Sequence, residues 1–201
     1  MNSEDRRTSI VDAACKLFAE KGFRGTTTRE LAGAVGVTEP VLYEHFKTKR
    51  DLYTAIIEAK AKHGIDSVHA LAAKFDGSDD DAEFFQALGM NIVEWYTSDP
   101  TVIRLLLFSN LEGHELKDLF HERGAICFRV VAEHIRRRIH AGGIRDVDPV
   151  VAARAFFGMV AHYAMSGLVF GFAPFTKPTE EVVAEMVDIF MTGMCARTQS
   201  K

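Results

Sequence analysis

Three cations gather around an expected helix start about a quarter of the way along the chain. They are Lys47, Lys49 and Arg50, and they surround Thr48. Thr48 followed by Asp51 has the residue types and the spacing of a helix N-cap with its capping-box partner. The positive end of a helix dipole disfavours cations, so this cluster needs an anion that compensates it. A phosphate satisfies that need, because helix N–H groups and basic side chains bind it together.

Start and stop signals divide the preceding residues into short helices that would position this cluster. Gly22 closes one helix, since glycine adopts the left-handed conformation at a helix end without steric penalty. Thr27 and Glu30 have the capping-box pattern of a second helix, which Gly36 interrupts. The inner face of that helix would consist of Leu31, Ala32 and Val35.

A third short helix follows the glycine turn. Thr38 is expected to cap it, and Pro40 is tolerated in the first turn, where no amide partner is needed. Tyr43 and His45 fall on its outer face, because its apolar residues recur at other positions three to four apart: Val41, Leu42 and Phe46. A helix, a glycine-containing turn and a second helix form the helix-turn-helix arrangement, in which the second helix enters the DNA major groove.

The same stretch resembles the N-terminal domain of the tetracycline-repressor (TetR) family of regulators. The resemblance covers roughly the first quarter of the chain and starts with the pattern Ile10-x-x-Ala13-Ala14-x-x-Leu17-Phe18. Many further positions agree at fixed spacing: Gly22-Phe23, Thr26-Thr27, Leu31-Ala32, Gly36-Val37-Thr38, Leu42-Tyr43-x-His45-Phe46, Lys49 and Leu52. The implied domain boundary separates a DNA-binding domain, residues 1–48, from a ligand-binding and dimerisation domain, residues 49–201.

The resemblance also implies roles for individual residues. Phosphates would be held by Thr27, Tyr43 and Lys49. The residues facing the groove would be Thr38, Glu39, Pro40, Glu44 and His45. We add Arg29 and Lys47 as basic residues that can attract the DNA backbone.

The expected recognition helix is poor in positive charge. Many family members carry a small or basic residue where this chain has Glu39, Pro40 and Glu44. A carboxylate can accept a hydrogen bond from cytosine N4, but phosphates repel it. We therefore expect binding to depend on phosphate contacts elsewhere, including those of Arg6, Arg7, Arg24 and Arg29, and to weaken steeply with salt.

Composition is that of a soluble globular protein. The chain has 201 residues, 47% of them hydrophobic and 26% charged, with a net charge of −4. Its three cysteines are far apart and odd in number, which favours buried thiols in a reduced, cytoplasmic protein over a disulfide framework. The N-terminus has no apolar core of a secretory signal. No cofactor is expected.

The fold class is all-α, with about nine helices and no convincing strand pattern. The fourth helix would begin at Lys49 and run to about residue 73. The fifth would span about 82–97, the sixth would end near 113, and a long seventh would end at Gly142-Gly143. Asp-Pro pairs would start the sixth helix at residue 99 and the eighth at residue 148, the latter reaching about Gly171. The ninth would follow Pro178.

Aromatic residues are frequent on helices five to seven. From the residues alone they are ordinary core, although helices of this length also bind small apolar molecules between them. The resemblance implies a ligand cavity in this region, so we name as candidate ligand contacts Trp95, Tyr96, Phe108, His114, Phe120, His121 and Phe128. No metal site is expected, because the segment that begins His114-Glu115 has Asp118 where a zinc motif needs a second histidine.

A run of 22 residues, 155–176, contains no Asp, Glu, Lys or Arg. Its length approaches that of a membrane span, but His162 and several glycines and prolines in its second half argue against one. The resemblance implies instead that the last two helices of each chain form a four-helix dimer interface. Its candidate residues are Gly158, Ala161, His162, Met165, Val183, Met186 and Phe190.

These observations predict a homodimeric, ligand-responsive transcriptional regulator. We expect a repressor that binds a palindromic, double-stranded operator and is released by a small, largely apolar effector. Two alternatives stay open at the level of sequence. One is an activator of the same family; the other is a helical-bundle carrier or enzyme whose helix-turn-helix serves only as scaffold. No arrangement of nucleophile, base and acid supports catalysis.

Overall fold

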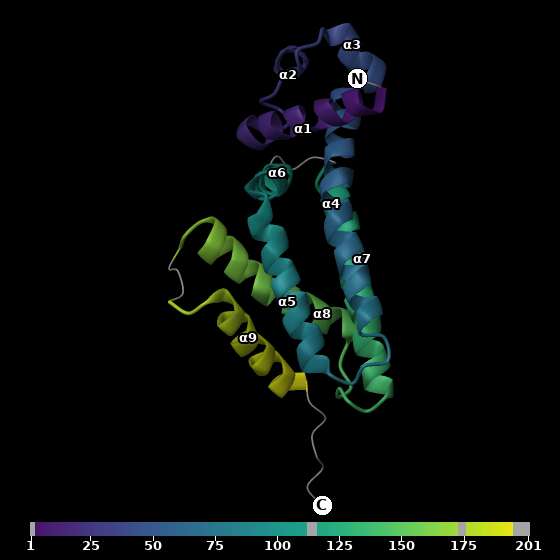
Figure 1. Cartoon of the computed structure of the whole chain (residues 1–201), viewed down its shortest axis with the longest axis vertical. Helices are drawn as coiled ribbons and strands as arrows, with labels where there is room; N and C mark the ends of the chain where they lie inside the picture. The colour runs from purple at the N-terminus through teal and green to yellow at the C-terminus, as the bar shows by residue number, and fades with distance from the viewer. Residues whose placement is uncertain (1–2, 112–115, 173–175, 195–201) are drawn as a thin grey trace, which may run out of the picture. The chain divides into compact units, whose positions relative to one another are not determined.

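The computed structural model of the protein describes residues 3–111, 116–172 and 176–194, and within these ranges the chain is helical without a strand (Figure 1). The first four helices are α1 (Ser3–Lys21), α2 (Thr28–Val35), α3 (Glu39–His45) and α4 (Lys49–Lys74). The middle of the chain forms α5 (Asp81–Ser98), α6 (Pro100–Leu111) and α7 (Leu116–His140). The last elements are α8 (Pro149–His162), the π-helical segment η1 (Tyr163–Val169) and α9 (Thr179–Met194). The expected all-α fold is confirmed.

Most of the expected helix starts are built as their sequence signals predict. Thr27 and Glu30 form a complete capping box, and Thr48 and Asp51 exchange hydrogen bonds of 3.0 and 3.1 Å. Asp148 caps α8 by accepting from two backbone amides. Local signals succeed here because a cap bonds to backbone only two or three residues away.

The side-chain cap expected from Thr38 is absent. Thr38 occupies the N-cap position of α3, but its hydroxyl makes no capping hydrogen bond. Pro40 lies two residues further on, at a position whose amide would otherwise donate to the cap, and proline has no N–H. Only one suitable donor is therefore left for Thr38, and the structure does not use it.

The eighth helix does not run unbroken to Gly171, as the sequence had suggested. The α-helix ends at His162, and η1 continues with wider turns, in which the Phe170 amide donates to the Met165 carbonyl five residues earlier. The Ser166 hydroxyl donates to the carbonyl of His162 and so gives this carbonyl an alternative to a backbone amide donor. Gly171, with φ of +68°, ends the segment.

The chain divides into two compact units. Unit 1 comprises residues 1–63 and 99–123, and unit 2 comprises residues 64–98 and 124–201. Helices α4 and α7 each contribute to both units. In unit 1, α1 packs against α2 and α6 around a core that includes Ile10, Phe18, Leu31, Leu42, Tyr53, Ile56 and Leu105.

Polar bonds attach α6 to the rest of unit 1. The Arg104 guanidinium donates from Nε to the carbonyl of Ala19 near the end of α1, at 2.9 Å. Lys60 of α4 forms an ion pair of 2.8 Å with Asp99, which also accepts from the amide of Thr101 in the first turn of α6. The helix-turn-helix therefore shares its core with α6, a helix more than forty residues further along the chain, and polar contacts tie α6 to the flanking helices α1 and α4.

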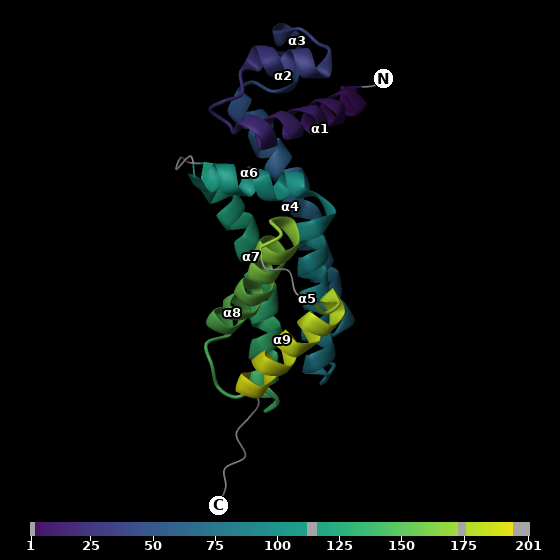
Figure 2. The same ribbon diagram turned by 90° about the vertical axis from the view of Figure 1, so that its left-hand side faces the viewer.

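In unit 2, α5 is the central helix and packs against α8, η1 and α9. Phe85, Phe156 and Phe190 form a cluster of rings with centroids about 5 Å apart. Gly89 lets α9 approach closely, since a Cβ at this position would lie only 2.5 Å from Cγ1 of Val183. Figure 2, turned by 90° from Figure 1, shows α8 and α9 together on the side facing the viewer.

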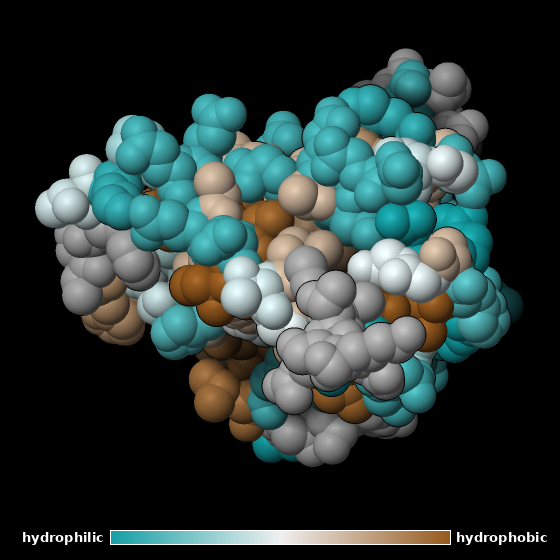
Figure 3. Space-filling model, turned by 90° about the horizontal axis from the view of Figure 1, so that it is seen from below, coloured by the Kyte–Doolittle hydropathy of each residue, from teal (hydrophilic) through white to brown (hydrophobic). Residues whose placement is uncertain are grey.

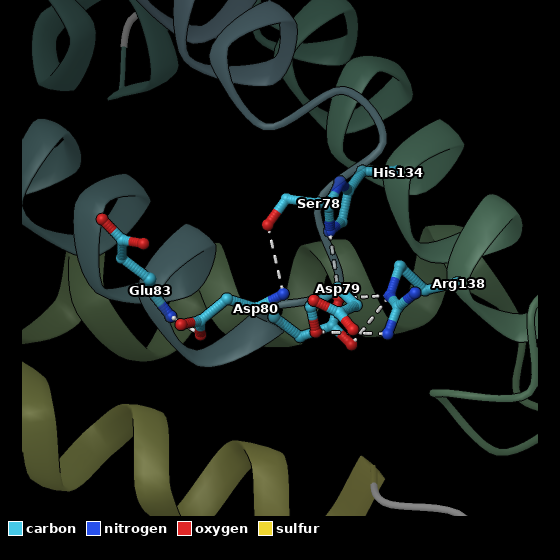
Figure 4. A network of polar contacts seen from close by, with 7 residues as sticks. Ser78, Asp79, Asp80, Glu83, His134 and Arg138 are labelled. Atoms are coloured by element: carbon cyan, nitrogen blue, oxygen red, sulfur yellow. Dashed lines mark hydrogen bonds and ion pairs between the residues drawn. The ribbon is translucent and has the colours of Figure 1, made fainter.

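A buried polar network joins α5 to α7 (Figure 4). Nε of Arg138 donates to both carboxylate oxygens of Asp81, at 2.9 and 3.0 Å, and Nε2 of His134 lies 3.3 Å from the same carboxylate. The His134 ring stacks on Phe84 with centroids 3.8 Å apart. Burial alone would raise the pKa of Asp81, but the hydrogen bonds from His134 and Arg138 outweigh burial and leave the pKa lowered.

Several large apolar side chains of unit 2 are exposed. Seen from below, hydrophobic residues interrupt the hydrophilic surface in separate places (Figure 3). Val151 of α8 and Ile189 of α9 are 65% and 68% exposed. In the part of the chain that the structure describes, no helix combines the length and the apolar character needed to cross a bilayer.

Candidate nucleic-acid interface

The turn between α2 and α3 sets the geometry of the helix-turn-helix. Gly36 adopts a φ of +72°, which strains any other residue, and the amide of Val37 donates back to the carbonyl of Ala32. Leu31 of α2 and Leu42 of α3 are both buried in the core of unit 1. The two helices therefore pack through their inner faces, and the outer face of α3 is left for solvent.

Four residues of the expected interface lie exposed on or beside α3. They are Thr38, Pro40, Tyr43 and Glu44, and Tyr43 is 43% exposed. His45, at the end of the helix, is half-buried. This exposed face offers a hydroxyl, a proline ring, a phenol and a carboxylate, which are groups that can contact base edges and phosphates.

Glu39 is placed differently from the sequence-based expectation. Its carboxylate accepts a hydrogen bond of 2.9 Å from the Thr28 hydroxyl at the start of α2, and the residue is half-buried. This carboxylate is thus held inside the helix-turn-helix, where it fastens the first turn of α3 to the first turn of α2. Sequence reasoning missed Thr28 because neither its type nor its spacing singles it out among three consecutive threonines.

Thr27 is exposed, but its hydroxyl is engaged within the chain. The hydroxyl accepts from the amide of Glu30 and donates to the Glu30 carboxylate, which also accepts from Lys21 at 2.6 Å. These hydrogen bonds, first from Lys21 and then from Thr27, lower the pKa of Glu30 to about 2. Glu30 thus stays ionised and holds the start of α2 at any physiological pH.

The basic residues fall into two groups. Arg29 and Lys47 are exposed, as a contact with the DNA backbone requires. Lys49 is half-buried, and its ammonium donates to the carbonyls of Phe23 and Thr26, at 2.8 and 2.9 Å. Two carbonyl oxygens of the same chain therefore compensate the positive charge of Lys49 at the start of α4.

Arg7 supports the other end of α3. Its Nη1 donates to the carbonyl of His45 at 2.9 Å, and its guanidinium lies 4.1 Å from the centroid of the Phe46 ring. The last carbonyls of a helix lack partners within the helix and attract cations. No sequence signal reveals this contact, because 38 residues separate Arg7 from His45.

The candidate ligand contacts lie in both units. In unit 2, Trp95 packs edge-on against Tyr96, whose pKa is raised by burial, and Phe128 packs edge-on against Phe157. In unit 1, Phe108 is half-buried and His121 is exposed. His114 lies outside the described residues, as does the side chain of Phe120 on α7. That these residues line one ligand site stays a prediction.

The candidate dimer residues have different environments. Gly158 and His162 are exposed, and Ala161, Met165, Met186 and Phe190 are half-buried. Val183 is fully buried against Gly89 in the chain's own core, and its assignment to the dimer interface stays a prediction. An exposed row along α8 has helical spacing and consists of Val151, Ala155, Gly158 and His162.

Comparison with known proteins identifies the family. The model of bacterial regulatory proteins of the tetR family matches residues 10–56. The model of the C-terminal domain of AefR-like transcriptional repressors matches residues 84–193, which is over half of the chain. Tetracycline repressor protein class D of Escherichia coli is 47% identical over 58 residues, 28% of this chain and 27% of that protein. The chain thus matches only about a quarter of that relative's length.

Solved structures extend the likeness across the whole chain. A TetR-family transcriptional regulator from Mesorhizobium loti superposes with a TM-score of 0.78 at 20% identity, covering 98% of this chain and 100% of that one. AibR, in complex with isovaleryl coenzyme A and operator DNA, superposes with a TM-score of 0.67 at 25% identity, covering 92% and 97%.

The fold and the exposed face of α3 define an all-helical protein with an N-terminal helix-turn-helix. The two family matches, at residues 10–56 and at residues 84–193, are more specific. The chain belongs to the TetR family of transcriptional regulators.

Proposed function

We propose that the protein is a ligand-responsive repressor that binds operator DNA as a homodimer. The observation that carries the proposal is the exposed face of α3, which is free of core contacts while both ends of the helix are bonded within unit 1. A helix held in this way can enter the major groove without first being ordered. The matches to a class D tetracycline repressor and to AefR-like repressors favour repression over activation. Such a regulator works on the chromosome and so belongs in the cytoplasm.

The homodimer would form through α8 and α9. The exposed row of Val151, Ala155, Gly158 and His162 has two small residues, Ala155 and Gly158, at its centre, which permits close approach of a second helix. Ile189 adds an exposed apolar side chain on the neighbouring α9. A two-fold axis through this face would duplicate α3, so the operator should be an inverted repeat.

The effector would be a small molecule with an apolar acyl group. Support comes from the apolar interior around Tyr96 and Phe128 and from AibR, which binds isovaleryl coenzyme A in its solved complex with operator DNA. Release of the operator requires only that the effector bind the conformation that does not fit DNA more tightly than the conformation that does. A hundredfold preference corresponds to about 2.7 kcal/mol of coupling, which lies within the usual range for allosteric proteins.

Selection of duplexes from a random DNA pool by the purified full-length protein tests the proposal. We expect enrichment of one inverted repeat, and we expect it to be lost with the variant Pro40→Arg/Tyr43→Ala, which alters the exposed face of α3. If the wild-type protein enriched no duplex, the proposed DNA binding would be wrong. A carrier or enzyme would show that result while still binding its small molecule.

The effector is tested on the selected duplex. Acyl-coenzyme A thioesters of two to eighteen acyl carbons, and the matching free acids, are added to the complex while fluorescence anisotropy reports release. We expect release by a subset of chain lengths and none by coenzyme A alone. A reporter gene placed behind the selected operator then distinguishes repression from activation, because an activator would raise expression.

A further inference from the structure

The ammonium of Lys49 is held within unit 1 by two backbone carbonyls and one aromatic ring. It donates to the carbonyl oxygens of Phe23 and Thr26, at 2.8 and 2.9 Å, and lies 4.3 Å from the centroid of the Phe23 ring. At least two of its three donors are therefore used inside the protein. The Phe23 ring is itself packed against Phe18 and Tyr53 in the core of unit 1.

Both carbonyls belong to the turn that joins α1 to α2. Gly22 begins this turn with a φ of +72°, and the hydroxyl of the buried Thr26 donates to the Gly22 carbonyl at 2.8 Å. Thr26 directly precedes Thr27, the N-cap of α2. Lys49, the first residue of α4, therefore ties the start of α4 to the residues that decide where α2 begins.

A continuous set of contacts leads from this turn to the recognition helix. Thr28, the first residue of α2, donates to Glu39, the first residue of α3. A shift of the turn would therefore move the start of α2 and, through the bond between Thr28 and Glu39, the start of α3. Lys49 is thus connected to α3 through three intermediate residues, Thr26, Thr27 and Thr28, all of them within the chain.

The charge of Lys49, in the first turn of α4, is compensated by groups of the protein itself. A cation in the first turn of a helix is disfavoured by the helix dipole, so its place there requires negative partners. The sequence suggested a phosphate as that partner. The two carbonyl dipoles and the face of the Phe23 ring supply the compensation within the free protein.

We infer that Lys49 is a positioning residue for operator binding, which sets the orientation of α2 and α3 rather than neutralising a phosphate. The inference rests on the proposed function, since it concerns how strongly the helix-turn-helix holds DNA. It assigns to Lys49 an effect on affinity that does not depend on salt. A phosphate contact would instead act through counterion release.

The test compares Lys49→Met with Lys47→Met on the selected operator across a range of salt concentrations. Methionine keeps the length and apolar contact of Lys49 but removes its donors and charge. We expect Lys49→Met to bind about tenfold more weakly at every salt concentration, with a salt slope that stays close to that of wild type. Lys47 is exposed, and its loss should reduce the slope by about 1.8 for a dimer that gives up two phosphate contacts.

Two outcomes would overturn the inference. A slope reduced by about 1 or more in Lys49→Met would show that Lys49 contacts phosphate. An unchanged dissociation constant, measured well below the melting temperature and corrected for the active fraction, would show that Lys49 contributes to stability alone. Lys49→Gln gives the same slope test if the methionine variant melts too low. Failure of the proposed function looks different, because the wild-type protein would then select no operator.

Discussion

The hydroxyl of Thr28 donates to the carboxylate of Glu39 at 2.9 Å and thereby joins the first residues of α2 and α3. This hydrogen bond removes one of two carboxylates from the face that the helix-turn-helix presents to DNA. The other, on Glu44, is exposed. In the proposed complex with DNA, this bond would reduce the repulsion between α3 and the phosphates that the sequence suggests.

Thr28→Val should weaken operator binding severalfold, because it releases the Glu39 carboxylate toward the phosphates and loosens the start of α3. The double variant Thr28→Val/Glu39→Gln should recover most of the lost affinity, since the freed group is then neutral. Fluorescence anisotropy on the four proteins of this cycle measures the coupling between the two positions. Additive effects of the two substitutions would contradict the proposed link.

The network around Asp81 predicts a loss of stability in acid. The pKa of Asp81 is lowered in the folded protein, so the unfolded chain binds its proton more readily. Its contribution is therefore present above the ordinary aspartate pKa of 3.8 and disappears as the pH falls through the lower, folded value. Urea unfolding from pH 7 down to pH 3 should show this decline in wild type.

Asp81→Asn should unfold more easily at pH 7 by about 3 kcal/mol, because Arg138 would be left without its anionic partner. Its stability should also fall less steeply in acid than that of wild type. The matched control is Asp188→Asn on the exposed face of α9, which should retain the wild-type pH dependence. Equal acid sensitivity of Asp81→Asn and wild type would contradict the assignment.

Two helical glycines should respond in opposite directions to replacement by alanine. Gly89→Ala should destabilise the protein by about 1–3 kcal/mol, because its Cβ would lie 2.5 Å from Val183 between α5 and α9. Gly124→Ala should stabilise it by about 0.5–1 kcal/mol, since α7 has open space at this position and alanine favours a helix. Chemical denaturation of both variants measures the difference.

The proposed dimer face predicts a change in assembly. Gly158→Arg should convert the protein to a monomer at micromolar concentration, because the exposed row on α8 cannot then approach a second copy closely. Ala73→Arg, at an exposed position near the end of α4, is the matched control and should leave assembly unchanged. Analytical ultracentrifugation distinguishes the two. A Gly158→Arg protein that still sediments as a dimer would place the interface elsewhere.

The helix-turn-helix could be read from the sequence because most of its signals are local. The boxes of Thr27 with Glu30 and of Thr48 with Asp51 each bridge three residues, and Gly36 acts through its own φ angle. Within the same segment Thr38 occupies the expected N-cap position of α3, but its side chain makes no capping hydrogen bond, because Pro40 removes one of the amides that a cap needs. Contacts with bases and phosphates do not depend on such local signals. The roles expected for the base-facing and phosphate-binding residues therefore stay predictions.

By itself, the sequence determined the all-α class, most of the helix starts and the family resemblance, since these depend on neighbouring residues and on spacing. Only the tertiary structure decided which side chains are already engaged. Lys49 bonds to carbonyls 23 and 26 residues earlier, and Arg7 bonds to a carbonyl 38 residues later. Val183 belongs to the core because Gly89, far away in sequence, makes room for it. Long-range packing sets these partners, and no period or motif along the chain encodes them.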